Sequence, residues 1–222
     1  MQVKLVLMSA HNTDEITREI EKLVGKAADK INIAIISEAV GGDSWDVREW
    51  LIDSLVNMRN AFGGEFYWCN LVSVDIKETE ETINKADVIW VLGGHVSFLK
   101  RIFDQTGFSK LLPKLLKSKV WVGSSAGSCV IGKKPFINPD YDNKHEAKNW
   151  LEIVNLIIEP HVWAPHEHGT PYEMCVEESL KSKDIPVYAL SDDSAVIVEN
   201  GEVYMIGRKA HEIVNGKITN NI

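Results

Sequence analysis

Residues 119–131 read KVWVGSSAGSCVI, and this stretch decides how the rest of the sequence is interpreted. The apolar run at 120–122 has the character of a buried strand. Gly123-Ser-Ser-Ala-Gly127 then fits the G-x-S-x-G pattern of a nucleophile elbow, a sharp turn from strand to helix. Glycines two residues before and two after Ser125 remove side chains that would collide in such a turn. The pattern selects Ser125 as a candidate nucleophile; the alternative is a tight strand–helix turn without catalysis.

Short apolar runs alternate with amphipathic segments on both sides of this turn. Strands are predicted at residues 3–8, 31–36, 87–92 and 120–122, with another at either 66–69 or 71–74. Helical spacing of apolar residues occurs at 16–24, 47–58, 98–103 and 111–116, and the first of these follows Asn12-Thr-Asp-Glu15, which has the spacing of a capping box.

This order predicts an α/β fold with a mainly parallel sheet, helices on both faces and ligands at the carboxyl ends of the strands. The last third of the chain differs, because strands predicted at 187–190, 194–199 and 202–206 are closely spaced. Asn200-Gly201 between the last two is a hairpin signal. We therefore expect an antiparallel β appendage at the edge of the sheet near the C-terminus. With no internal repeat and no flexible linker, residues 1–222 are expected to form a single domain.

A serine nucleophile needs a general base and an acid that orients the base. A strand predicted at 153–158 leads into Glu159-Pro-His161, which places His161 at a strand terminus where loops gather. His166 and His168 follow in a loop and are weaker candidates. Together with Glu167 these histidines are of metal-ligand type, but their spacing matches no metal motif, so no metal or other cofactor is expected.

Three of the acids between Ser125 and His161 are candidates for the orienting acid, and their spacing does not choose among them: Asp140, Asp142 and Glu146. A further feature is Gly93-Gly94, directly after the strand at 87–92. Two glycines there allow backbone N–H groups to approach a ligand closely, so that one could stabilise an oxyanion together with the N–H of Ala126. The alternative is a plain strand–helix turn.

In this order the motifs resemble the peptidase E family of serine peptidases, which also includes cyanophycinases. The resemblance extends from about residue 3 to residue 206. It implies that Ser125 is the nucleophile and His161 the general base. It further implies Asp140 as the orienting acid, with Asp142 or Glu146 as substitutes, and an oxyanion hole formed by the N–H groups of Gly94 and Ala126.

The family's fold is similar to that of class I glutamine amidotransferase domains, a flavodoxin-like three-layer sandwich. Those domains carry cysteine at the elbow, whereas this chain has serine there, and Cys129 is expected to be a core residue. Aspartyl dipeptidases of the family have asparagine after the paired glycines, where this chain has His95, a candidate substrate-binding residue. They also carry an arginine beyond the catalytic histidine, whereas this chain has none between His161 and Arg208. Specificity for an N-terminal aspartate therefore does not follow from the resemblance.

The composition and net charge of the chain argue against some classes of binding partner. The 222 residues include 24 Lys+Arg and 32 Asp+Glu, a formal net charge of −8, which argues against broad nucleic-acid binding and against adhesion to an anionic membrane. Three widely separated cysteines favour a reducing, cytoplasmic location over a disulfide framework.

The expected function is that of a serine exopeptidase or dipeptidase that hydrolyses dipeptides or short peptides through an acyl-enzyme. Its expected partner is a small peptide substrate, and the expected assembly is a monomer or homodimer. Two alternatives stay open: an esterase or amidase that uses the same triad, and a catalytically silent amidotransferase-like binding module.

Overall fold

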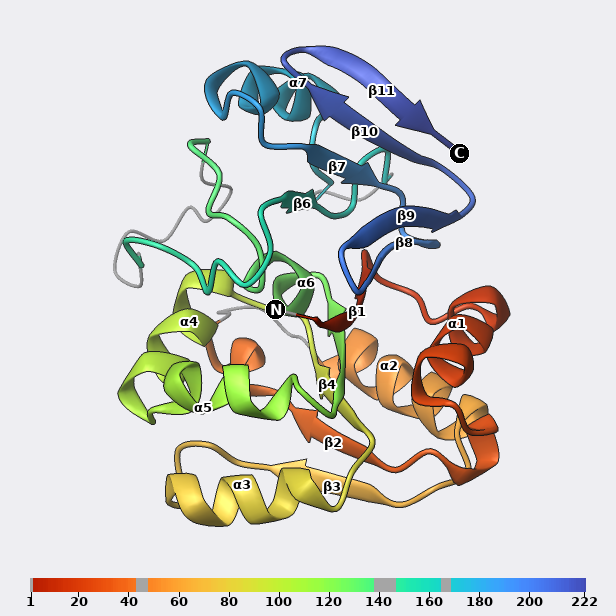
Figure 1. The fold of residues 1–222 in the computed structure, drawn as a ribbon, viewed down its shortest axis with the longest axis vertical. Helices are drawn as coiled ribbons and strands as arrows, with labels where there is room; N and C mark the ends of the chain where they lie inside the picture. The colour runs from red at the N-terminus through yellow and green to blue at the C-terminus, as the bar shows by residue number, and fades with distance from the viewer. Residues whose placement is uncertain (1, 43–47, 138–146, 165–168) are drawn as a thin grey trace.

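The computed structural model describes residues 2–42, 48–137, 147–164 and 169–222, whose strands form two sheets (Figure 1). One sheet contains β1 (Lys4–Met8), β2 (Ile33–Ile36), β3 (Phe66–Cys69), β4 (Val88–Val91), β5 (Val120–Ser124), β8 (Ser194–Glu199) and β9 (Glu202–Gly207). The other contains β6 (Ile157–Glu159), β7 (Val187–Leu190), β10 (Ala210–Val214) and β11 (Lys217–Asn221).

The larger sheet has the order β3-β2-β4-β5-β1-β8-β9. Strands β1 to β5 are parallel, with Leu5 opposite Trp121 and Ile35 opposite Trp90. Strand β8 then pairs antiparallel with β1 and with β9. A mixed α/β fold with a mainly parallel sheet is thus confirmed.

Helices cover both faces of this sheet. The α-helices are α1 (Asp14–Val24), α2 (Arg48–Ala61), α3 (Ile76–Asn84), α4 (Val96–Gln105), α5 (Phe108–Leu115), α6 (Ala126–Cys129) and α7 (Tyr172–Lys181), with two short 3₁₀ helices, η1 (Ala28–Lys30) and η2 (Glu38–Gly42). The predicted capping box is wrong by one residue: Thr13, not Asn12, caps α1, and its hydroxyl accepts the Ile16 N–H. Within the described ranges, no helix is both long and apolar enough to cross a membrane.

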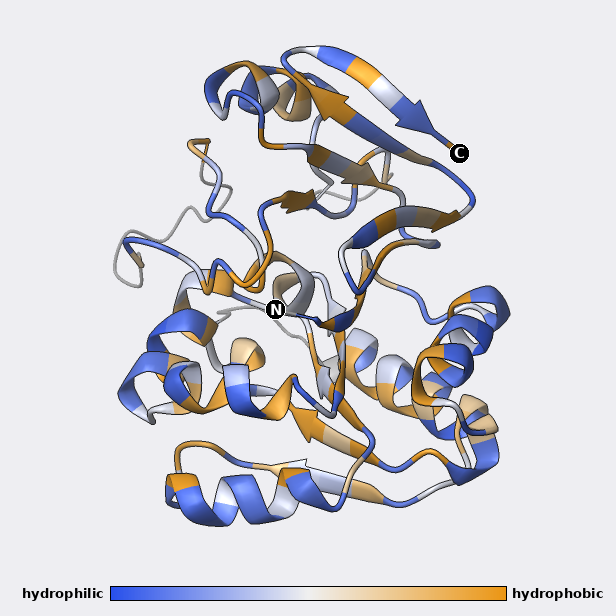
Figure 2. Cartoon of the chain, viewed as in Figure 1, coloured by the Kyte–Doolittle hydropathy of each residue, from blue (hydrophilic) through white to orange (hydrophobic). Residues whose placement is uncertain are grey.

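Alternation along each buried strand divides the core into two layers. In β1, Leu5 and Leu7 belong to the core layer beneath α3, α4 and α5, while Val6 and Met8 belong to the layer beneath α1 and α2. Figure 2 shows β2 as a hydrophobic strand and α3 as a mostly hydrophilic helix at the surface. Apolar residues on both faces explain why these strands appear in the sequence as continuous apolar runs.

The C-terminal third of the chain contributes strands to both sheets, and not only an appendage to the larger one. Strands β8 and β9 extend the larger sheet as the predicted antiparallel hairpin. Strand β7, which we expected beside them, instead pairs parallel with β6 and antiparallel with β10 in the second sheet. Strands β10 and β11 were not predicted. In Figure 1 the second sheet and α7 lie at one end of the molecule, beyond β8 and β9.

This arrangement predicts very different costs for two isoleucine truncations. Ile20 of α1 is fully buried, whereas Ile52 of α2 is 57% exposed. Ile20→Ala should lower the free energy of unfolding by about 2–5 kcal/mol. The matched control Ile52→Ala should change it by less than about 0.5 kcal/mol. Urea unfolding of both variants measures this, and equal losses would contradict the layer assignment.

Candidate active site

Ser125 lies in a strained turn between β5 and α6. Its φ of 48° and ψ of −110° lie outside the regions that L-residues ordinarily adopt. Its N–H is 2.9 Å from the Ser9 carbonyl oxygen and 3.1 Å from that of Met8, so the end of β1 anchors the turn. A strained backbone of this kind persists only where its surroundings enforce it, and it is typical of catalytic turns.

The glycines of the elbow are required by close backbone packing. A Cβ atom on Gly123 would lie 2.4 Å from the carbonyl carbon of Gly127, and one on Gly127 would lie 2.2 Å from the Val91 carbonyl oxygen. The buried Trp121 indole N–H donates to the Gly127 carbonyl oxygen at 3.1 Å. The predicted reason for these glycines, relief of collisions in a sharp turn, therefore agrees with the geometry.

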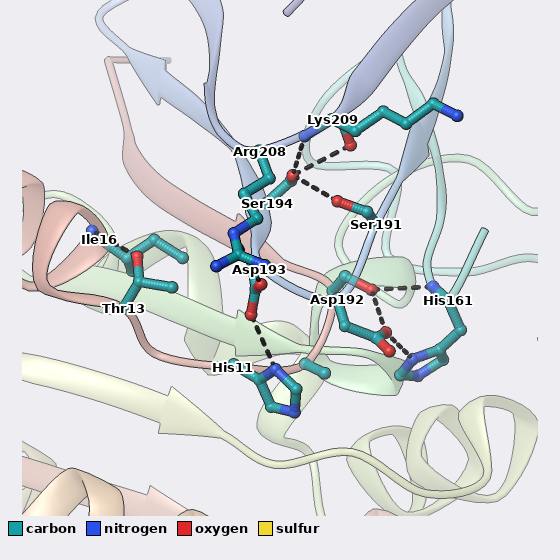
Figure 3. A network of polar contacts seen from close by, with 12 residues as sticks. His11, Thr13, Ile16, His161, Ser191, Asp192, Asp193, Ser194, Arg208 and Lys209 are labelled. Carbon is teal, nitrogen blue, oxygen red and sulfur yellow. Dashed lines mark hydrogen bonds and ion pairs between the residues drawn. The ribbon is translucent and has the colours of Figure 1, made fainter. Parts of the chain in front are cut away.

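His161 follows strand β6 and faces the elbow. Its Nε2 is 2.9 Å from the Ser125 hydroxyl oxygen, and its Nδ1 is 2.7 Å from an oxygen of the Asp192 carboxylate. Figure 3 shows the His161 ring directed at that carboxylate. Its backbone is also unusual, with φ of 59°. Serine, imidazole and carboxylate thus form a continuous hydrogen-bonded chain, the arrangement that activates a serine nucleophile.

Asp192 lies in the short turn between β7 and β8. Strands β6 and β7 are parallel neighbours, so His161 and Asp192 both follow the carboxyl ends of adjacent strands. The Asp192 carbonyl oxygen also accepts the N–H groups of Ala10 and His11, at 3.2 and 2.9 Å. This fixes the turn against the end of β1.

Asp192 is not among the acids that the sequence suggested, because those candidates all lie between Ser125 and His161 in the chain. The available signal was Ser191-Asp-Asp-Ser194, a polar turn between two strands that were themselves predicted. The predicted acid Asp140 and its substitutes Asp142 and Glu146 lie outside the described residues, as do His166, Glu167 and His168.

The paired glycines lie beside Ser125. A Cβ on Gly93 would be 3.2 Å from the Ser125 Cβ, and Gly94 has φ of 128°, with an added Cβ 2.4 Å from the Ala39 carbonyl oxygen. His95 caps α4: its Nδ1 accepts the Phe98 N–H at 3.2 Å, and its side chain is largely buried. A contact between His95 and substrate stays a prediction.

The hydrogen-bonded residues are partly open to solvent, with the side chains of His161 and Asp192 22% and 21% exposed. A second cluster of charged groups flanks it: Asp193 accepts from His11 Nδ1 at 2.9 Å and lies 3.5 Å from the Arg208 Nε (Figure 3). Exposed pairs of this kind contribute little to stability.

Cys129, expected to be a core residue, is a buried thiol, and Cys69 and Cys175 are buried as well. The Cys129 Sγ lies 3.4 Å from the Ile158 carbonyl oxygen, away from the nucleophile position. Burial raises the pKa of the Cys69 thiol to about 12, which leaves it protonated and unreactive at neutral pH. Among the described residues, no three His, Cys, Asp or Glu side chains gather as a metal site.

The chain is similar in sequence to known peptidases. The sequence profile described as peptidase family S51 matches residues 5–206. Peptidase E of Haemophilus influenzae is 28% identical over 155 residues, which cover 65% of this chain and 70% of that protein. An uncharacterized peptidase of Listeria innocua is 24% identical over 139 residues, covering 61% of this chain. The match spans 64% of that relative's length, slightly under two thirds.

Two solved structures share the fold. A putative peptidase E from Listeria monocytogenes superposes with a TM-score of 0.73 at 18% identity, covering 94% of this chain and all of that one. A peptidase from an acI-B1 actinobacterium gives a TM-score of 0.69 at 17% identity, covering all of this chain and 97% of that one.

The packing of the elbow predicts a selective cost of adding one methyl group. Gly127→Ala would place Cβ against the backbone oxygen of Val91, so it should lower the free energy of unfolding by about 1–3 kcal/mol. Gly41→Ala is the control, because its nearest neighbour would be the Phe98 ring at 3.5 Å, an ordinary contact. Urea unfolding compares the two. A Gly127→Ala protein as stable as wild type would show that the backbone around Gly127 has room for a Cβ atom.

Proposed function

Because the chain belongs to peptidase family S51, we propose that it is a serine exopeptidase that cleaves dipeptides or short peptides through Ser125, His161 and Asp192. Family membership supports a serine peptidase, and the resemblance to a family that includes aspartyl dipeptidases supports short peptides as substrates. The observation that carries the proposal is the hydrogen-bonded chain from the Ser125 hydroxyl through the His161 ring to the Asp192 carboxylate.

In the proposed reaction, the Ser125 oxygen attacks the peptide carbonyl carbon while His161 Nε2 takes the hydroxyl proton. The imidazolium then gives this proton to the leaving amine as the C–N bond breaks, which leaves an acyl-enzyme that water hydrolyses by the same steps. Asp192 holds the ring through Nδ1 and stabilises its positive charge. The N–H groups of Gly94 and Ala126 are the proposed donors to the oxyanion.

Two alternatives use the same residues differently. An esterase or amidase would share the triad, and a panel of acyl esters tested beside peptides separates it from a peptidase. A catalytically silent binding module has no need of an activated serine. The separation of 2.9 Å between His161 Nε2 and the Ser125 oxygen, within hydrogen-bond distance, therefore counts against it.

Covalent labelling tests the nucleophile without knowledge of the substrate. A fluorophosphonate probe should modify the wild-type protein at Ser125, because an activated serine attacks phosphorus as it attacks a carbonyl carbon. Intact-mass analysis should show a single adduct, absent from Ser125→Ala. The matched control is Ser124→Ala, which should still label. An unlabelled wild-type protein, or a labelled Ser125→Ala protein, would overturn the proposal.

The choice of acid gives a separate test. Asp192→Asn should lower kcat by about 10³- to 10⁴-fold, because asparagine no longer holds the ring in the tautomer that accepts the serine proton. Asp140→Asn, at the acid that the sequence suggested, should lower it by less than about 10-fold. Steady-state rates on the best peptide of a library measure both. A large loss for Asp140→Asn with a small one for Asp192→Asn would reverse the assignment.

A further inference from the structure

Ser9 follows the last residue of β1, and its contacts reach every member of the proposed triad. Its carbonyl oxygen accepts the Ser125 N–H at 2.9 Å. Its hydroxyl oxygen accepts the His161 N–H at 2.8 Å. The same hydroxyl donates to the Asp192 carboxylate at 3.3 Å, on the oxygen that His161 Nδ1 contacts.

The side chain that makes these contacts is closed off from water. Ser9 is 0% exposed, so its hydroxyl has no solvent to replace a lost partner. This buried hydroxyl uses its single donor on a carboxylate and one of its acceptor sites on a backbone N–H, and both contacts restrain its geometry. Its own N–H is held as well, donating to the Ser194 carbonyl oxygen at 3.0 Å.

The Ser9 hydroxyl joins two groups, and one of them needs an external restraint. His161 has φ of 59°, a left-handed conformation that a non-glycine residue keeps only when its neighbours enforce it. The Asp192 oxygen that His161 Nδ1 contacts also accepts the Ser9 hydroxyl. One hydroxyl group therefore contacts both residues, at the point where the two sheets meet.

From these contacts we propose that Ser9 is a positioning residue of the active site, whose hydroxyl holds His161 and Asp192 in the arrangement that activates Ser125. The inference rests on the proposed function, because it assigns Ser9 a role in the same reaction. Ser9 does not contact the reacting atoms through its hydroxyl. Its loss should therefore slow the chemical step and leave binding of a small ligand nearly unchanged.

The test compares fluorophosphonate labelling of wild type, Ser9→Ala and Ser179→Ala, each corrected for its folded fraction from thermal unfolding. Ser179 is the matched control: it is also 0% exposed, accepts the Gly216 N–H at 2.9 Å and donates to the Val176 carbonyl oxygen at 2.8 Å, in the second sheet's packing against α7. Ser9→Ala should lower the maximal labelling rate by about 10- to 100-fold, the effect of one hydrogen bond to a charged group. The probe concentration at half-maximal rate should stay within about twofold of wild type.

Ser9→Cys covers the case in which Ser9→Ala does not fold. It keeps one heavy atom on Cβ but replaces the hydroxyl with a weakly hydrogen-bonding thiol, so the same loss of maximal rate is expected. A wild-type rate in the folded Ser9 variant, or an equal loss in Ser179→Ala, would overturn the positioning role. A wild-type protein that does not label at all would instead overturn the proposed function, and this inference with it.

Discussion

The antiparallel pairing of β8 with β1 is the constraint on which the site depends. It sets Met8 opposite Ala195 at the end of β1, next to the turn that contains Asp192. The same turn ends β7 and so joins the second sheet to the first. Because this pairing is a backbone ladder, it fixes the start of β8, and so the β7–β8 turn, beside the end of β1 without relying on side-chain fit.

Two pairs of parallel strands meet across this junction. Ser9 and Ser125 directly follow β1 and β5, while β6 and β7 lead to His161 and Asp192. In parallel sheets, functional groups gather at carboxyl ends because neighbouring strands terminate at the same edge. Here two such edges face one another, and the Ser125–His161 hydrogen bond crosses between them. This explains how a serine and a histidine from different sheets come within 2.9 Å.

The features that local sequence specifies could be predicted. The elbow around Ser125 is a short pattern with its own steric reason, and the buried parallel strands are apolar on both faces. The position of His161 at a strand end could be inferred because the apolar run before it predicts a buried strand. Strand β11 escaped prediction because all its residues are exposed and it carries no apolar pattern.

Asp192 could not be found in this way, because its role depends on contacts distant in sequence. Only the pairing of β8 with β1, and of β7 with β6, brings the turn at 191–193 to the imidazole. Ser9 is hidden for a similar reason: in the sequence it is one small residue after a strand. Its contacts at sequence separations of 152 and 183 residues exist only in the folded chain.

In the proposed triad a single imidazole joins Ser125 to Asp192, and nitrogen-15 NMR of the His161 ring reports which ring nitrogen carries the proton. When the ring is neutral, Nδ1 should carry the proton, with a far-downfield proton resonance that Asp192→Asn abolishes. Nε2 should be unprotonated, since it accepts from the Ser125 hydroxyl. A ring protonated on Nε2, with no downfield resonance from Nδ1, would show that His161 is not arranged as a base for Ser125.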